Sequence, residues 1–137
     1  MLTKIEINNE DIKELESIFK NEDKQDVTVH FANRMVSARV YIDSYEESNL
    51  YFYISNNEVV VQNISVTNKR SGIGTKLIKE CAKIGKNKGV DNIRIQSVLT
   101  DEMVSLCKKL NIKQDKNLIW SGDKGDYITT IDNILNC

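Results

Sequence analysis

Residues 58–88 read EVVVQNISVTNKRSGIGTKLIKECAKIGKNK, and this stretch decides the fold. Residues 59–64 form a β-rich apolar run, and apolar residues recur at helical spacing after Thr75. Between them lies a polar turn that contains Gly72 and Gly74. Two glycines at the junction of a strand and a helix let the backbone approach a bound group and point N–H donors at it. Because a helix N-terminus also attracts anions, the stretch predicts a phosphate-binding turn.

Two common phosphate-binding motifs do not match these residues. A P-loop requires G-x-x-x-x-G-K-S/T, whereas Gly74 is followed by Thr75 and Lys76 in the reverse order, and no glycine stands five residues earlier. A dinucleotide-binding motif requires G-x-G-x-x-G directly after a strand, but Leu77 occupies the place of the third glycine. A mixed α/β module that binds ATP or NAD is therefore the least favoured interpretation.

The residues KRSGIG at positions 69–74 resemble Q/R-x-x-G-x-G/A, the pyrophosphate-binding motif of the GNAT (GCN5-related) N-acetyltransferases. Lys69 stands where that family usually has Gln or Arg. The resemblance implies that the turn binds the pyrophosphate of coenzyme A. It also implies that the backbone of the preceding strand pairs with the pantetheine arm. The alternative is a glycine-rich turn that binds no ligand.

The resemblance assigns cofactor contacts to three parts of the chain. The turn and the start of the helix would bind the pyrophosphate through Lys69, Arg70, Ser71, Gly72, Ile73, Gly74 and Thr75. The preceding strand would meet the pantetheine arm through Ile64, Ser65 and Val66. Thr100 stands where the family often has an asparagine that contacts the cofactor, although the same threonine can cap a helix.

Two residues are candidates for catalysis under the same resemblance. Glu58 lies eleven residues before Lys69, where histone-type members of the family place a glutamate that takes a proton from the acceptor ammonium. Cys107 lies where the family often has a tyrosine that protonates the departing thiolate, and a thiol can serve in principle. The alternatives are an exposed turn residue for Glu58 and a core residue for Cys107. Tyr127, on the last expected strand, could also point into the cleft where the family binds its acyl-coenzyme A.

The composition limits the class of protein. The 137 residues carry a net charge of −1 and suffice for a single domain, 1–137, with its own core. Three cysteines without a C-x-x-C pair, and His30 as the single histidine, argue against a metal site, a disulfide framework and a Ser-His-Asp triad. No sequence pattern indicates a signal peptide, a membrane span or a nucleic-acid-binding surface. We therefore expect a cytoplasmic protein.

Charge is distributed unevenly along the chain. Residues 1–58 hold 12 acidic and 6 basic residues, whereas residues 59–137 hold 8 acidic and 13 basic residues. The basic half, which contains the glycine turn, suits an anionic cofactor. The acidic half would suit a cationic acceptor, although solvated surfaces explain most such patterns.

Turn residues and periodicity divide the chain into strands and helices. Helices are expected after Asn9, after Gly74 and after Thr100. Strands are expected over residues 1–7, 27–31, 35–42, 50–54, 59–64, 92–98, 118–120 and 127–131. This order resembles the GNAT topology along nearly the full length. The expected fold class is α/β (α+β), with a mixed, mostly antiparallel central sheet flanked by helices and with splayed central strands.

The resemblance implies a GNAT-type N-acetyltransferase that moves acetyl from acetyl-CoA, as cosubstrate, to a primary amine by direct attack in a ternary complex. No metal is expected. The acceptor is a small-molecule or protein amine that the sequence does not identify. An exposed edge strand could pair two copies as a homodimer. The alternative is a catalytically degenerate member of the same fold that binds acyl-CoA, or a protein partner, without turnover.

Overall fold

The computed structural model describes residues 7–8, 10–23, 27–32, 35–42, 45–65 and 72–136. Among these residues, no helix combines the length and the apolar character needed to span a membrane. The strand expected over residues 1–7 lies outside the described residues except for Ile7, which is in neither a helix nor a strand. The elements, in chain order, are α1 (Lys13–Asp23), β1 (Val27–Ala32), β2 (Met35–Ile42), β3 (Tyr45–Ser55), β4 (Glu58–Ser65), α2 (Ile73–Asn87), β5 (Asn92–Val98), α3 (Asp101–Lys109), β6 (Lys113–Ser121), β7 (Lys124–Thr130) and α4 (Ile131–Leu135).

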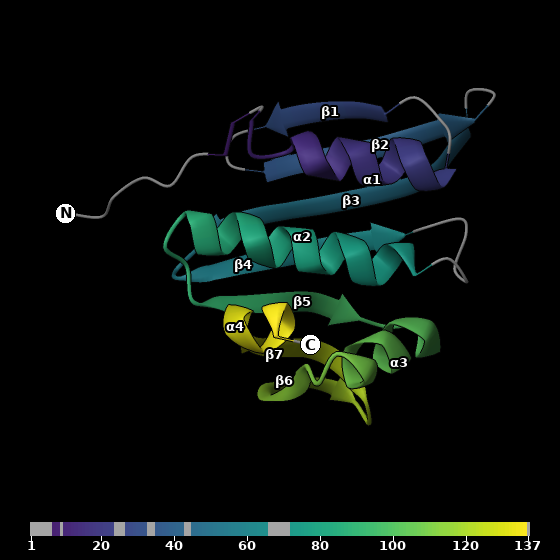
Figure 1. Ribbon diagram of the computed structural model, residues 1–137. Coiled ribbons are helices and arrows are strands. Elements are labelled where there is room, and N and C mark those ends of the chain that lie inside the picture. Colours follow the sequence, from purple (N-terminus) through teal and green to yellow (C-terminus); the bar gives the residue numbers. More distant parts are fainter. Residues whose placement is uncertain are drawn as a thin grey trace.

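The described strands form one seven-stranded sheet in the order β1-β2-β3-β4-β5-β7-β6 (Figure 1). Every neighbouring pair is antiparallel except β4 and β5, which run parallel. Parallel neighbours need a crossover rather than a tight turn, and α2 provides it. The sheet is thus mixed and mostly antiparallel, which confirms the fold class predicted from the sequence.

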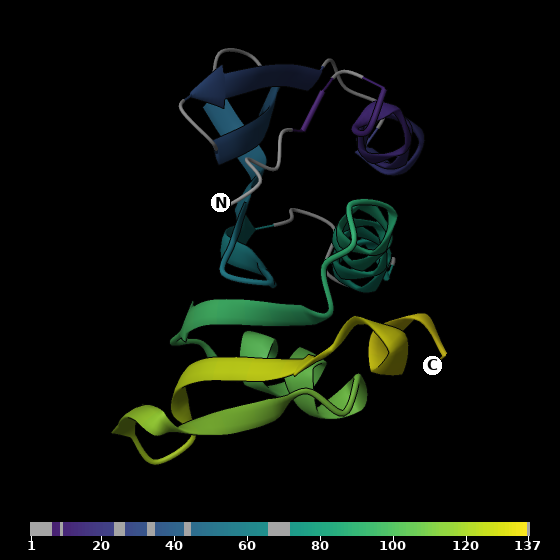
Figure 2. The same cartoon turned by 90° about the vertical axis from the view of Figure 1, so that its left-hand side faces the viewer.

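Three helices cover one face of this sheet. Figure 2 shows α1, α2 and α4 on the same side of the strands. The apolar stripe predicted for α2 is confirmed, because all its members are at most 3% exposed: Leu77, Ile78, Cys81 and Ile84. The central strands meet the helices with alternate residues that are at most 2% exposed: Val59, Val61, Ile93 and Ile95. This arrangement is the main core of the molecule.

A glycine within α2 allows the helix to approach the sheet closely. A Cβ atom at Gly85 would lie 2.3 Å from Val59 Cγ2 and 2.8 Å from Ile131 Cδ1. Both distances are far below van der Waals contact, so a larger residue would push α2 away from β4 and α4. Glycine costs about 1 kcal/mol relative to alanine in a helix interior. The close packing at Gly85 explains why the helix contains one here.

The two parallel strands pair over only part of their length. Their register contains four residue pairs, from Glu58 with Asn92 to Val61 with Ile95. Beyond these pairs β4 continues to Ser65 and β5 continues to Val98. Gln62 is an extra residue in β4, because Val61 opposes Phe52 of β3 and Asn63 opposes Tyr51. A bulge of this kind bends a strand and increases its twist. The central strands therefore part, as the family resemblance implied.

The largest differences from the expected elements are earlier starts of β3 and β6 and an additional helix, α4, after β7. β3 begins at Tyr45, because residues 45–49 extend its antiparallel ladder with β2. β6 begins at Lys113, because that residue and Gln114 pair with β7. Residues 131–135 form a helix, which begins where the Thr130 side chain accepts a hydrogen bond from the Asn133 N–H. Periodicity alone does not reveal strand segments whose residues are mostly polar.

Candidate functional site

The turn before α2 ends in a left-handed glycine. Gly72 is the N-cap residue of α2, with φ 76° and ψ 12°. A Cβ atom at this position would meet no atom within 4 Å, so the requirement for glycine is conformational rather than steric. The first turn of α2 contains no acidic residue. The N-terminus of α2 therefore presents its positive end without a competing carboxylate.

The second glycine of the turn has a packing role. A Cβ atom at Gly74 would lie 3.2 Å from Leu106 Cδ2, which belongs to α3. This distance is tight, so Gly74 allows α3 to lie against the start of α2. Ile73, between the two glycines, is 1% exposed and anchors this end of the helix in the core. Thr75 is half-buried in the same turn.

Four of the expected cofactor-binding residues lie outside the described part of the chain. These residues are Val66, Lys69, Arg70 and Ser71. Their roles stay predictions from the family resemblance. The described residues on either side are the end of β4, where Ile64 is half-buried, and Gly72 at the start of α2. The expected binding segment therefore connects the parted end of β4 to the helix N-terminus.

The parted end of β4 offers a backbone edge. Residues 63–65 pair with β3 on one side, through Asn63 with Tyr51, Ile64 with Leu50 and Ser65 with Asn49. Pairing with β5 on the other side ends at Val61. The second edge of residues 62–65 is thus not taken up by β5. An extended ligand that carries amide groups, as pantetheine does, can pair with a strand edge of this kind.

Glu58 lies at the opposite end of β4, where the two strands are paired. Arg94 of β5 donates two hydrogen bonds to its carboxylate, from Nε to Oε2 at 3.0 Å and from Nη2 to Oε1 at 3.1 Å. The two side chains are only 15% and 21% exposed. A bidentate pair of this geometry fixes the orientation of both groups. Glu58 precedes Val61, the last residue paired with β5, by three positions, or about 10 Å along the strand.

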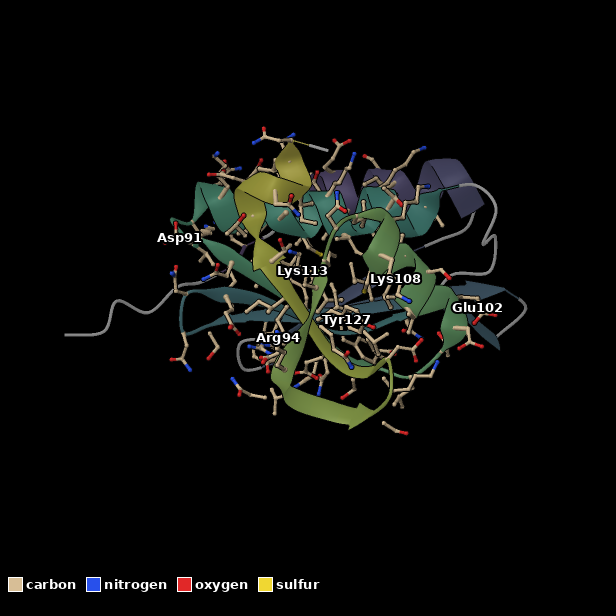
Figure 3. The ribbon with its side chains drawn as sticks, turned by 90° about the horizontal axis from the view of Figure 1, so that it is seen from below. Asp91, Arg94, Glu102, Lys108, Lys113 and Tyr127 are labelled. Atoms are coloured by element: carbon tan, nitrogen blue, oxygen red, sulfur yellow. The ribbon has the colours of Figure 1, made fainter. Side chains whose placement is uncertain are left out.

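Arg94 also binds two further carboxylates. Its Nη1 lies 2.9 Å from Asp115 Oδ2 of β6 and 3.2 Å from Asp126 Oδ2 of β7. Arg94 lies on the side of the strands that faces away from α2 (Figure 3). These ion pairs join four neighbouring strands, and we call the four residues the Arg94 cluster. The hydrogen bond to Glu58, the largest contribution, raises the pKa of Arg94. The hydrogen bond from the Asn117 N–H lowers the pKa of Asp115 most, and the hydrogen bond from Arg94 lowers it further.

The Arg94 cluster contains three carboxylates around a guanidinium. Among the described residues, no group of three His, Cys, Asp or Glu side chains is arranged to hold a metal. The guanidinium supplies the positive charge that these partly buried carboxylates need. The cluster is therefore a structural ion-pair network that includes one of the two residues predicted for catalysis.

Cys107 lies in the hydrophobic core. Its side chain is fully buried, and burial raises the pKa of the thiol to about 12. Tyr127 is 3% exposed, and its hydroxyl donates a hydrogen bond to the Asp123 carbonyl at 2.6 Å. Burial also raises the pKa of Tyr127. Both groups thus stay protonated at neutral pH, and the tyrosine hydroxyl is already engaged.

Thr100 caps α3. Its side-chain oxygen accepts a hydrogen bond from the Met103 N–H at 3.2 Å, which confirms the predicted cap. Leu99 precedes it, directly after β5, and is 54% exposed. Thr100 itself is exposed, so the cap leaves its surface accessible.

Sequence reasoning missed Arg94, Asp115 and Asp126. One signal was present, since Arg94 lies between Ile93 and Ile95 and so must face away from the core. Its partners could not be found in the same way. Glu58, Asp115 and Asp126 lie 36, 21 and 32 positions from Arg94, on strands whose register the sequence does not specify.

No protein-family model matches the sequence, and no curated protein matches it either. Solved structures do resemble it. The PaiA N-acetyltransferase from Thermoplasma acidophilum in complex with coenzyme A has a TM-score of 0.52 at 14% identity, over 85% of this chain and 67% of that chain. A Bacillus subtilis acetyltransferase in complex with coenzyme A has a TM-score of 0.51 at 15% identity, over 95% and 96% of the two chains. Tetrahymena GCN5 has a TM-score of 0.51 at 15% identity, over 74% and 71%.

Proposed function

Because this chain has the fold of the GNAT N-acetyltransferases, we propose that it transfers an acetyl group from acetyl-CoA to a primary amine in a ternary complex. The observation that carries the proposal is the opening between β4 and β5, with the left-handed Gly72 and the start of α2 beside it. The similar proteins from T. acidophilum and B. subtilis were solved with coenzyme A. The proposal extends that ligand to this chain.

The backbone would provide most of the binding. The edge of residues 62–65 that does not pair with β5 would bind the amides of the pantetheine arm, and the N–H groups around Gly72 and Gly74 would bind the pyrophosphate. Lys69 and Arg70 would add full positive charges beside the turn. Acetyl-CoA supplies the activated acyl group. The chain's part is to hold the thioester at the place where β4 and β5 separate.

Glu58 is the proposed proton acceptor. In the reaction an N–C bond forms as the C–S bond breaks, the thiolate of coenzyme A leaves, and the amine must first lose its ammonium proton. Both oxygens of Glu58 accept hydrogen bonds from Arg94. The proton would therefore reach Glu58 through a water molecule, or Arg94 would first move away from Glu58. In the second case Arg94 would keep its ion pairs with Asp115 and Asp126.

A second candidate function is binding of acyl-CoA without turnover. Two observations favour it. The Glu58 carboxylate already forms an ion pair with Arg94. Cys107, at the expected position of the general acid, is buried, and burial raises the pKa of its thiol to about 12. A protein that binds the cofactor but lacks an accessible base and acid would retain the fold and lose the chemistry.

Thermal unfolding with and without acetyl-CoA tests the binding step. A ligand at a hundred times its dissociation constant adds about 2.7 kcal/mol, enough to raise the unfolding midpoint of a domain of this size by several degrees. We expect this shift with acetyl-CoA and none with ATP or NAD at equal concentration. No shift at millimolar acetyl-CoA would contradict both candidate functions.

A pair of glycine substitutions shows whether the turn is the binding site. Gly72 and Gly122 both have positive φ, 76° and 58°, and at neither would a Cβ atom meet a neighbour within 4 Å. Gly72→Ala and Gly122→Ala therefore impose a similar backbone strain, about 1 kcal/mol. We expect a loss of acetyl-CoA affinity of tenfold or more only for Gly72→Ala. Equal affinities would place the binding site elsewhere.

Glu58→Gln separates the two candidates. We expect turnover to fall by about a hundredfold or more with an unchanged affinity for coenzyme A, because glutamine cannot take the proton. Asp115→Asn is the matched control, since it also removes a carboxylate from Arg94 but should keep turnover. Unchanged turnover in Glu58→Gln would remove its role as base. Coenzyme A binding without turnover of any tested amine would favour the second candidate.

A further inference from the structure

β5 contains a bulge that is held by a side chain from the neighbouring strand. Ile95 pairs with Tyr127 of β7, and Val98 pairs with Gly125, so two residues of β5 oppose the single residue Asp126. Ser97, one of the two, has φ 54°. A left-handed serine inside a strand is uncommon and persists only where its surroundings hold it.

Asp126 provides that support. It is the only buried charged residue among those that the structure describes, with 5% of its surface exposed. Its Oδ1 accepts a hydrogen bond from the Ser97 N–H at 2.9 Å, and its Oδ2 accepts one from Arg94 Nη1 at 3.2 Å. The carboxylate therefore links the left-handed residue to the Arg94 cluster. The N–H that the bulge turns away from the strand ladder receives its partner from Asp126.

This bulge lies where β5 leaves β4. Ile95 is the last residue of β5 that pairs with β4, through Val61, and the bulge occupies the next two positions. On the β4 side, Gln62 is the extra residue, and it directly follows Val61. Each of the two parallel strands thus departs from regular pairing immediately after the same residue pair. Bulges next to a site re-aim strands and end pairing.

We propose that Asp126 is a positioning residue that holds the opening between β4 and β5. Its carboxylate fixes Ser97 in the left-handed conformation, and the bulge then directs residues 96–98 away from β4. The consequence for ligand binding rests on the proposed function, because it assumes that the opening admits the pantetheine arm of acyl-CoA. In the sheet register Asp126 lies on β7 opposite the bulge of β5, whereas residues 63–65 lie on β4 and pair with β3.

Asp115 supplies a matched control. Asp115 binds the same Nη1 atom of Arg94 as Asp126 does, but its other hydrogen bond is to the Asn117 N–H and not to β5. Asp115→Ala thus removes an ion pair from the same cluster without touching the bulge. Asp126→Asn is the conservative variant, because its amide oxygen can still accept the Ser97 N–H.

The test combines amide hydrogen exchange at Ser97 with titration calorimetry of coenzyme A, on the full chain. In Asp126→Ala we expect Ser97 to exchange at least tenfold faster and coenzyme A affinity to fall at least tenfold. Asp126→Asn should restore both toward the wild type, and Asp115→Ala should change neither by more than twofold. A general loss of stability would speed amide exchange throughout the sheet, so the amides of β3 are the internal reference and should keep their exchange rates in Asp126→Ala.

The proposal is overturned if Asp126→Ala leaves Ser97 exchange or coenzyme A affinity unchanged, or if Asp115→Ala reproduces its effects. If the wild type does not bind coenzyme A, the proposed function fails, and Ser97 exchange in Asp126→Ala alone decides the claim about the bulge. If Asp126→Ala does not fold, the exchange rate of the Ser97 amide in the wild-type protein tests the claim about the bulge. Ser97 must then exchange at least tenfold slower than in an unstructured peptide, and an unprotected amide would refute the proposal.

Discussion

The two parallel strands are tied together at one end and separated at the other. At the first end, residues 58–61 pair with residues 92–95, and Arg94 joins Glu58 to carboxylates from β6 and β7. At the second end, Gln62 and Ser97 belong to bulges, and among the described strands β4 pairs there only with β3 and β5 only with β7. Both ends lie within runs that are rich in Val and Ile.

The difference shows how one strand pair can serve two purposes. Backbone groups at the tied end satisfy one another, so they contribute to stability and leave nothing for a ligand. At the separated end, the backbone groups of β4 that point toward β5 form no ladder with it. The tied end keeps this edge in place, because strands that are fixed over four residue pairs cannot close or slide freely beyond them.

Removal of the central cation should weaken the tied end most. Arg94→Leu leaves Glu58, Asp115 and Asp126 together without a positive charge, and breaking a partly buried ion network of this kind costs about 3 kcal/mol. Urea unfolding at pH 7 measures the loss. Lys86→Leu, which breaks the exposed pair between Lys86 and Asp132 at 2.7 Å, is the control and should cost less than about 1 kcal/mol. Similar losses for both variants would contradict the special role of the cluster.

Gly85→Ala should loosen the same end from the helical side. Alanine gains about 1 kcal/mol of helix propensity, but its Cβ would lie 2.3 Å from Val59 Cγ2. Overpacking of this kind costs about 1–3 kcal/mol, so we expect a net destabilisation of about 1 kcal/mol. The thermal midpoint measures it, with Lys83→Ala on the exposed face of α2 as the control. A stabilised Gly85→Ala protein would show that α2 can move away from β4 at little cost.

The smallest expected effect is a change in pH dependence at the edge of the cluster. The Asn117 N–H and Arg94 hold the pKa of Asp115 below its usual range. Stability from this group is therefore complete above the unfolded pKa of about 3.9 and is lost as the pH falls toward the lower folded pKa. Asp115→Asn should lose less stability than the wild type between pH 5 and pH 3, as a difference in urea midpoints. Parallel pH profiles for the two proteins would exclude this contribution.

Local patterns were sufficient for much of the fold and for part of the site. The strand, turn and helix at residues 58–88, the stripe from Leu77 to Ile84, and the Thr100 cap all depend on neighbours a few positions apart. The sequence also placed Gly72 at the turn, where its φ of 76° explains the glycine. Boundaries failed where the pairing partner decides, as at Tyr45 and Lys113.

The sequence by itself therefore determined the order of elements from α1 to β7, the buried stripes and the glycine turn, because periodicity, caps and turn residues act over short distances along the chain. The tertiary structure alone decided the Arg94 cluster, the close contact at Gly85 and the two bulges where β4 and β5 part. The contact at Gly85 depends on the packing of α2 against β4 and α4, and the cluster and the bulges depend on the register between strands. A shift of one residue in that register would turn Arg94 and its carboxylates to opposite faces of the sheet.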